Sequence, residues 1–192
     1  MTLLRIDECK NDVLVIEEIT APSSALKLIG GKWQKWLSDN APENTSWTMT
    51  KISLKTCSVA YIYSFTNNKL YPQESAISFL PTLLAQTLVP ISPESRKLSG
   101  PQPQEGEVDF RKAWNPKIIF DGKIVDGTVG AYSIVWPKDD TELSGKNVDL
   151  YFPENAGLTY FPYWVELHGK FTKVKFFVVD SGKNLSTDKK VP

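Results

Sequence analysis

The sequence has 192 residues, a length that favours a single domain. It holds 22 lysines and arginines against 22 acidic residues, and this balance removes the electrostatic reason to expect a nucleic acid or an anionic membrane as partner. Two cysteines and one histidine exclude a disulfide framework and most metal sites, so we expect no metal and no cofactor.

Charged residues already occur within Met1–Glu8, so the apolar run at the beginning of the sequence is too short for the centre of a signal peptide. No apolar run approaches the roughly 18 residues of a membrane span, so we predict a soluble protein without a transmembrane segment. It is then cytoplasmic, or exported with its signal already removed. Cys9 and Cys57 are interpreted as buried or half-buried thiols, and a single disulfide between them stays open.

The N-terminal half, residues 1–91, is predicted to mix strands and helices. Alternation of apolar and polar residues indicates strands, and apolar spacings of three and four indicate amphipathic helices. Gly30 and Gly31 weaken the first helix, and Pro81 should kink the second or mark its first turn. The predicted elements are a strand at Asp12–Ile19, a helix at Ser24–Asp39, strands within Trp47–Phe65 that bend near Cys57, and a helix at Glu74–Val89.

The second half of the chain follows a segment rich in proline and glycine, residues 92–107, which predicts a long surface loop or linker. Residues 108–185 are interpreted as a ladder of short strands, and residues 186–192 as a flexible tail. Turns between the strands leave no room for crossover helices, so the pairing should be antiparallel. The strands are expected at Lys117–Asp121, Tyr132–Trp136, Asn147–Phe152, Tyr163–His168 and Thr172–Asp180.

Together these elements predict one α+β domain over residues 1–192. Its centre would be a curved antiparallel β-sheet of about 6–8 strands, since alternation gives the sheet one apolar side. The two amphipathic helices are the obvious cover for that side. Whether residues 92–107 are ordered stays open.

Few residues could carry catalysis. His168 follows Glu166 at strand spacing, so both side chains share a face, and a general base oriented by a carboxylate is one interpretation. The alternative is a histidine at a strand end that faces solvent. We assign no catalytic residue and expect a protein that is not an enzyme, with His168 and Glu166 kept as a weak candidate pair for a hydrolase.

Aromatic residues are the unusual feature of the sequence. Fourteen of the 22 aromatic side chains lie between Phe110 and Phe177. The run Tyr160–Trp164 must point to both faces of an extended chain, so either both faces are covered within the domain or some rings lie exposed. Exposed rings usually mark a binding surface.

We therefore predict a non-enzymatic binding protein that recognises an apolar ligand, a lipid or acyl chain, or the apolar segment of a protein partner. An adaptor or structural subunit of a larger assembly is a second interpretation, in which residues 92–107 would order on a partner. A hydrolase is the third. The residues expected to line the binding surface are Trp136, Phe152, Tyr163 and Trp164.

Overall fold

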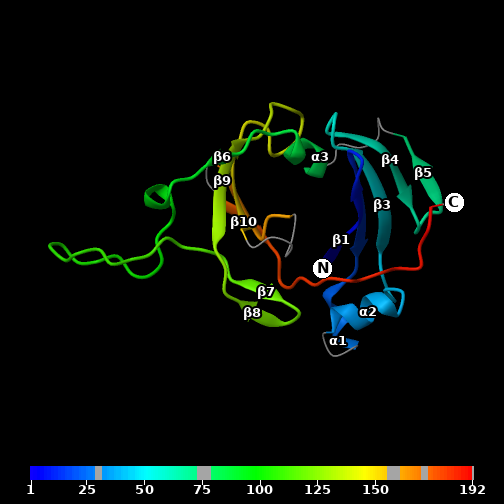
Figure 1. The fold of residues 1–192 in the computed structure, drawn as a ribbon, viewed down its shortest axis with the longest axis horizontal. Helices are drawn as coiled ribbons and strands as arrows, with labels where there is room; N and C mark the ends of the chain where they lie inside the picture. Colours follow the sequence, from blue (N-terminus) through cyan, green and yellow to red (C-terminus); the bar gives the residue numbers. More distant parts are fainter. Residues whose placement is uncertain (29–31, 73–78, 155–160, 170–172, 192) are drawn as a thin grey trace. The chain divides into compact units, whose positions relative to one another are not determined.

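The computed structural model describes residues 1–28, 32–72, 79–154, 161–169 and 173–191 (Figure 1). The chain divides into two compact units. The first consists of Met1–Ala85 together with Asn184–Pro192, and the second of Gln86–Lys183. The prediction of one domain stays a prediction, but the end of the chain belongs to the same unit as its beginning.

The first unit is built on a five-stranded antiparallel sheet in the order β1-β2-β3-β4-β5. Asn11 and Asp12 both have positive φ, a conformation that asparagine and aspartate tolerate, and they close a tight turn between the first two strands. Cys57 also has positive φ, at the bend that the sequence indicates. The strands are β1 (Thr2–Lys10), β2 (Val13–Thr20), β3 (Ser46–Ser53), β4 (Ser58–Ser64) and β5 (Lys69–Tyr71).

The helical part of the prediction is wrong. In the described residues the α-helices are short, with six residues each: α1 (Ser23–Leu28), α2 (Trp33–Ser38) and α3 (Phe79–Leu84). Lys32 is non-helical, with φ −84° and ψ 86°, so the expected helix Ser24–Asp39 does not run through. Of the expected helix Glu74–Val89, residues 74–78 lie outside the described residues, the described helical part is α3, and Val89 belongs to a strand.

This protein is therefore mostly β, and not a curved sheet covered by two amphipathic helices. The local reason for the first error is visible in the sequence, because each of two adjacent glycines costs a helix about 1 kcal/mol relative to alanine. A six-residue helix is too short to be stable by itself and depends on packing.

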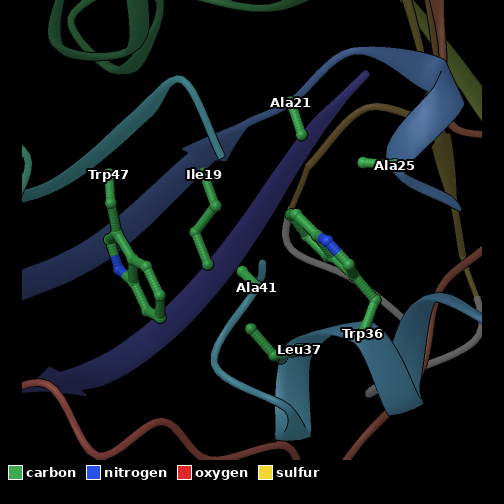
Figure 2. Close-up of a cluster of buried hydrophobic side chains, with 7 residues drawn as sticks. All are labelled: Ile19, Ala21, Ala25, Trp36, Leu37, Ala41 and Trp47. Atoms are coloured by element: carbon green, nitrogen blue, oxygen red, sulfur yellow. The ribbon is translucent and has the colours of Figure 1, made fainter. Parts of the chain in front are cut away.

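The core of the first unit shows how the short helices are used. Figure 2 shows the indole of Trp36 from α2 and Ala25 from α1 facing Ile19 of β2 and its neighbour Trp47 of β3. The Trp36 indole N–H donates to the carbonyl of Pro42 at 2.9 Å, which satisfies its one polar atom. The buried members of this cluster are Ile19, Ala21, Ala25, Trp36, Leu37, Ala41 and Trp47.

One buried charge lies on the same face of this sheet. Glu17 on β2 is fully buried, and it faces Arg5 on the neighbouring strand β1. The Arg5 Nε donates to Glu17 Oε2 at 2.8 Å, and the Thr187 Oγ1 lies 2.8 Å from Glu17 Oε1. Arg5 Nη1 also donates to the carbonyl of Leu185 at 3.3 Å. The C-terminal segment around Leu185 and Thr187 is thus hydrogen-bonded to the Arg5–Glu17 ion pair of β1 and β2.

The ionisation of Arg5 reflects both burial and its partners. Burial acts to lower the pKa of the guanidinium, but the hydrogen bonds and negative charges of Glu17 and Asp7 outweigh it, so its pKa is raised above the ordinary value. Arg5 therefore stays charged at every pH at which the fold persists, and the buried carboxylate keeps its cation.

The second unit contains a five-stranded antiparallel sheet in the order β12-β11-β10-β9-β6 and a separate hairpin of β7 and β8. The predicted antiparallel pairing is confirmed. A cluster of Ile118, Val129, Ala131, Tyr151 and Tyr163 forms the core between sheet and hairpin. The strands are β6 (Val89–Pro90), β7 (Ile118–Phe120), β8 (Lys123–Val125), β9 (Val129–Val135), β10 (Asn147–Pro153), β11 (Trp164–His168) and β12 (Lys173–Phe177).

Replacing Arg5 should destabilise the first unit strongly. Arg5→Met leaves the Glu17 carboxylate buried without its cation, and removal of one partner from a buried pair typically costs about 3–5 kcal/mol. The matched control is Asp7→Asn, which removes the exposed partner of the same guanidinium and should cost about 0–1 kcal/mol. Urea denaturation followed by circular dichroism measures both. Equal stabilities of the two variants would contradict the assignment.

Candidate functional site

The most open part of the second sheet is its edge strand β12. All five of its residues are exposed, and among the described residues it pairs with β11 alone. Val174, Phe176 and Phe177 are 48%, 56% and 60% exposed. Large apolar side chains on an unpaired strand edge favour association with another chain, because both the side chains and the backbone lack partners there.

The two faces of β12 differ in chemistry. Val174 lies opposite Leu167 of β11, and Phe176 lies opposite Val165. The two β11 residues are buried and the two β12 residues are exposed, so the apolar row on this face of the sheet continues onto an exposed strand. The other face carries Lys173, Lys175 and Phe177. We call these five residues, with the β11 residues that they contact, the β12 surface.

Aromatic and charged contacts fix the second face of the β12 surface. The ring of Phe177 stacks on Trp164, with centroids 5.4 Å apart, and the Lys175 ammonium lies 5.6 Å from the Trp164 ring centroid. The ring of Trp114 also packs edge-on against Trp164, with centroids 4.9 Å apart. The indole of Trp164 thus contacts two other rings and one ammonium group, and these contacts restrain its position.

Lys173 forms the ion pair of this face. Its Nζ donates to Glu166 Oε1 at 3.1 Å, and the Glu166 side chain is almost completely buried. Burial acts to raise the pKa of the Glu166 carboxyl, but the hydrogen bond and charge of Lys173 outweigh it, so its pKa is lowered below the ordinary value. Glu166 is therefore ionised at neutral pH and holds the lysine in place.

The four residues predicted to line a binding surface separate into two groups. Trp136 and Tyr163 are buried. The Trp136 indole N–H donates to Asp139 Oδ2 at 2.9 Å, and the Tyr163 hydroxyl donates to the carbonyl of Ile119 at 2.6 Å. Burial raises the pKa of the Tyr163 phenol above its usual value. Both rings are buried and have hydrogen-bond partners within the unit for their polar atoms, as structural residues do.

Phe152 and Trp164 are half-buried. Phe152 packs edge-on against Tyr132, with ring centroids 5.9 Å apart, and Trp164 lies beside β12 as described above. Of the predicted lining residues, Trp164 is the one that belongs to the β12 surface, through its contacts with Phe177 and Lys175.

The weak catalytic pair is not formed in the structure. His168 Nε2 lies 2.7 Å from Asp149 Oδ2, whereas Glu166 pairs with Lys173, so the carboxylate beside the imidazole is a different one from that expected. Within the described residues no serine, threonine or cysteine is hydrogen-bonded to His168, and a hydrolase would need such a nucleophile or an activated water. The described part of the chain also holds no group of three or more histidine, cysteine, aspartate or glutamate side chains suited to a metal ion.

Two exposed apolar segments were not assigned a binding role from the sequence. The run Lys173–Val179 alternates lysine with apolar residues and then continues as Phe-Phe-Val-Val, and this apolar end was the available signal for an exposed edge. The exposed Val108 and Phe110 lie close to the segment expected to be a loop, and nothing in their spacing indicates exposure.

Comparison with known proteins supplies a family and a fold. A family model described as CT021 protein matches residues 2–126. The solved structure of the hypothetical protein CT021 from Chlamydia trachomatis is similar, with a TM-score of 0.65 and 18% sequence identity over 98% of this chain and 84% of that chain. No curated protein matches. At this identity the likeness concerns the fold. Among the helices described, none is both long and apolar enough to cross a membrane.

Truncation should separate the interior rings from the surface rings. Trp136→Ala removes a buried indole and should cost about 3–5 kcal/mol of unfolding free energy. Phe177→Ala removes an exposed ring and should cost about 1 kcal/mol or less, the value of its stacking on Trp164. Urea denaturation gives both numbers. A loss for Phe177→Ala as large as that for Trp136→Ala would show that the β12 surface is part of the core.

The Glu166–Lys173 pair should make stability depend on pH. Because the pKa of Glu166 is lowered by folding, its contribution is complete above its ordinary value near 4.5 and is lost as the pH falls through the lower folded value. Glu166→Gln should therefore be less stable than the wild type by about 1 kcal/mol at pH 7, and the difference should shrink below pH 4.5. Urea midpoints at pH 7 and pH 3.5 measure this, and a difference that does not change with pH would contradict it.

Proposed function

The chain belongs to the CT021 protein family, and we propose that it is a non-enzymatic binding protein that takes up an extended apolar segment of a protein partner along the open edge of β12. The observation that carries the proposal is the exposure of all five residues of this edge strand, three of them large and apolar. An extended segment that adds to a sheet edge gains main-chain hydrogen bonds, and its side chains alternate between the two faces.

The chemistry of the two faces defines the partner segment. On the face of Val174 and Phe176 an added strand would place apolar side chains, because they would continue the buried row of Leu167 and Val165. On the face of Lys173 and Lys175 the added side chains would be acidic. The favoured occupant is thus a segment in which acidic and apolar residues alternate.

The other sheet edges support the choice of β12. The edge strand β1 carries a β-bulge between Ile6 and Glu8 and several charged side chains, and β5 has three residues. The edge strand β6 has two residues, and its Pro90 lacks an N–H to donate. Short strands, bulges, charges and proline are the usual protections of an edge. Lysines at 173 and 175 protect β12 in part, but they leave the apolar face open.

A partner segment is favoured over a lipid or acyl chain in a closed cavity. A cavity of that kind would be lined by the predicted rings, and two of them, Trp136 and Tyr163, have their polar atoms hydrogen-bonded inside the unit. An adaptor in a larger assembly would use the same edge, so that interpretation is included in the proposal.

The proposal predicts a preference between two peptides. A fluorescent eight-residue peptide of alternating valine and glutamate should bind the full chain more tightly than the same peptide with lysine for glutamate, as measured by fluorescence anisotropy. Phe176→Asp should abolish binding, and Lys175→Glu should weaken binding of the glutamate peptide about fivefold or more.

The matched control is Lys123→Glu, which makes the same change of charge on the hairpin strand β8 and should leave the affinity unchanged. Equal affinities for the two peptides, or an equal effect of Lys123→Glu and Lys175→Glu, would refute the proposed site.

A further inference from the structure

A second exposed apolar segment lies in the same unit. Residues 97–114 lie between β6 and β7 in the chain. They form a narrow finger that projects from the rest of the second unit (Figure 1). Its two sides are joined by the bridge between Leu98 and Ala113 and by backbone hydrogen bonds from Ser99 to Lys112, at 2.8 Å, and from Trp114 to Lys97, at 2.6 Å. Beyond this bridge the backbone carries Val108 and Phe110, which are 69% and 85% exposed.

The charges of the finger alternate with these apolar residues. Glu107 and Asp109 flank Val108, and Arg111 follows Phe110. Arg111 holds the Asp109 carboxylate with two short contacts, Nε to Oδ1 at 2.9 Å and Nη2 to Oδ2 at 2.7 Å. The side-chain hydrogen bonds from Arg111, together with its backbone N–H, lower the pKa of Asp109 to about 2. Asp109 is therefore ionised at neutral pH and paired with Arg111, and in the sequence it lies between the apolar residues Val108 and Phe110.

The finger has the pattern that the β12 surface requires. Residues 107–111 read Glu-Val-Asp-Phe-Arg, and residues 173–177 of β12 read Lys-Val-Lys-Phe-Phe. We infer that residues 107–111 of one copy add to β12 of a second copy as a parallel strand, in the register that places Val108 beside Val174. This inference rests on the proposed function and names the partner segment. The pairs are Glu107 with Lys173, Val108 with Val174, Asp109 with Lys175, Phe110 with Phe176 and Arg111 with Phe177.

This register satisfies both faces at once. On one face two acids meet two lysines, and a guanidinium meets an aromatic ring. On the other face valine meets valine and phenylalanine meets phenylalanine. An antiparallel arrangement with Val108 beside Phe176 keeps the apolar pairs but places Arg111 beside Lys173, and like charges directly opposite are unfavourable. The parallel direction is therefore favoured despite its slightly weaker backbone pairing.

The association joins two copies. In the structure Phe110 and Phe176 are both exposed, so within one chain they do not cover each other. Each copy has one finger and one β12, so two copies can exchange fingers reciprocally, or successive copies can form a chain.

A charge exchange tests the inference. In sedimentation velocity at low salt, the wild type should associate with rising concentration beyond the monomer mass of 21.6 kDa. Lys175→Glu and Asp109→Lys should each weaken this association about fivefold or more, and the double variant should restore it, because the pair of opposite charges is formed again with its signs exchanged. Lys123→Glu should have no effect.

Cysteine cross-linking tests the register. In a Cys9→Ser and Cys57→Ser background, copies with Val108→Cys and copies with Val174→Cys should form a mixed disulfide on oxidation, because adjacent strands lie within disulfide range. Phe110→Cys should not cross-link to Val174→Cys. A reversed preference would overturn the parallel register.

The outcomes separate this inference from the proposed function. A monomer at all concentrations, or an association that the double variant does not restore, overturns the finger as the partner. If the valine–glutamate peptide still binds in a manner that depends on Lys175, the β12 surface remains a binding site for another protein. If the peptide fails to bind as well, both proposals fall.

Discussion

An open antiparallel sheet leaves a row of unpaired backbone N–H and C=O groups along each of its two edges, and the proposed binding site rests on this constraint. The two five-stranded sheets have four edges in the described chain, formed by β1, β5, β6 and β12. Three of them are short, bulged, charged or blocked by proline. The fourth is an exposed strand whose two lysines protect it in part and whose apolar side chains Val174, Phe176 and Phe177 stay open.

The rigidity of the β12 surface comes from what lies behind it. Trp164 packs against Trp114 and Phe177, and the buried carboxylate of Glu166 pairs with Lys173. A strand that adds to this edge therefore meets side chains whose positions are already set, and loses less conformational freedom in docking than it would on a mobile surface. Preorganisation of this kind contributes to affinity without enlarging the contact area.

The sequence was sufficient for several of the strands and insufficient for the helices and the site. The strands at β2, β9, β10 and β11 lie close to their predicted ranges because alternation is a local property that burial of one face enforces. The strand β1 was missed because the charged residues Arg5, Asp7 and Glu8 interrupt the alternation of apolar and polar residues. Arg5 is accommodated in the strand because it pairs with Glu17 on β2. The helices were overestimated because apolar spacing outweighed the effect of Gly30 and Gly31 in the prediction.

The aromatic composition of the sequence suggested a binding surface in the second half of the chain, but it did not show which residues would form that surface. The number of rings in the second half of the chain left open whether all are covered or some lie exposed, and in the structure Phe110, Phe176 and Phe177 are exposed. Which ones are exposed depends on distant partners: Tyr163 is satisfied by the carbonyl of Ile119, and no local pattern contains that information. The same limit applies to His168, whose carboxylate partner is on the neighbouring strand at Asp149 and not two residues away.

The attachment of Thr187 to Glu17 has a consequence for how the molecule is made. These two residues are 170 positions apart, and the whole second unit lies between them. On a ribosome the sheet of the first unit emerges early, yet the threonine that completes its buried charge arrives only after the second unit has been synthesised. In the nascent chain the sheet of the first unit therefore lacks the hydrogen bond from Thr187 to Glu17 while the second unit is synthesised and folds. If translation stops before Thr187, Glu17 on β2 loses this hydrogen bond. The defect then lies near the N-terminus of the product, in the part that was translated first.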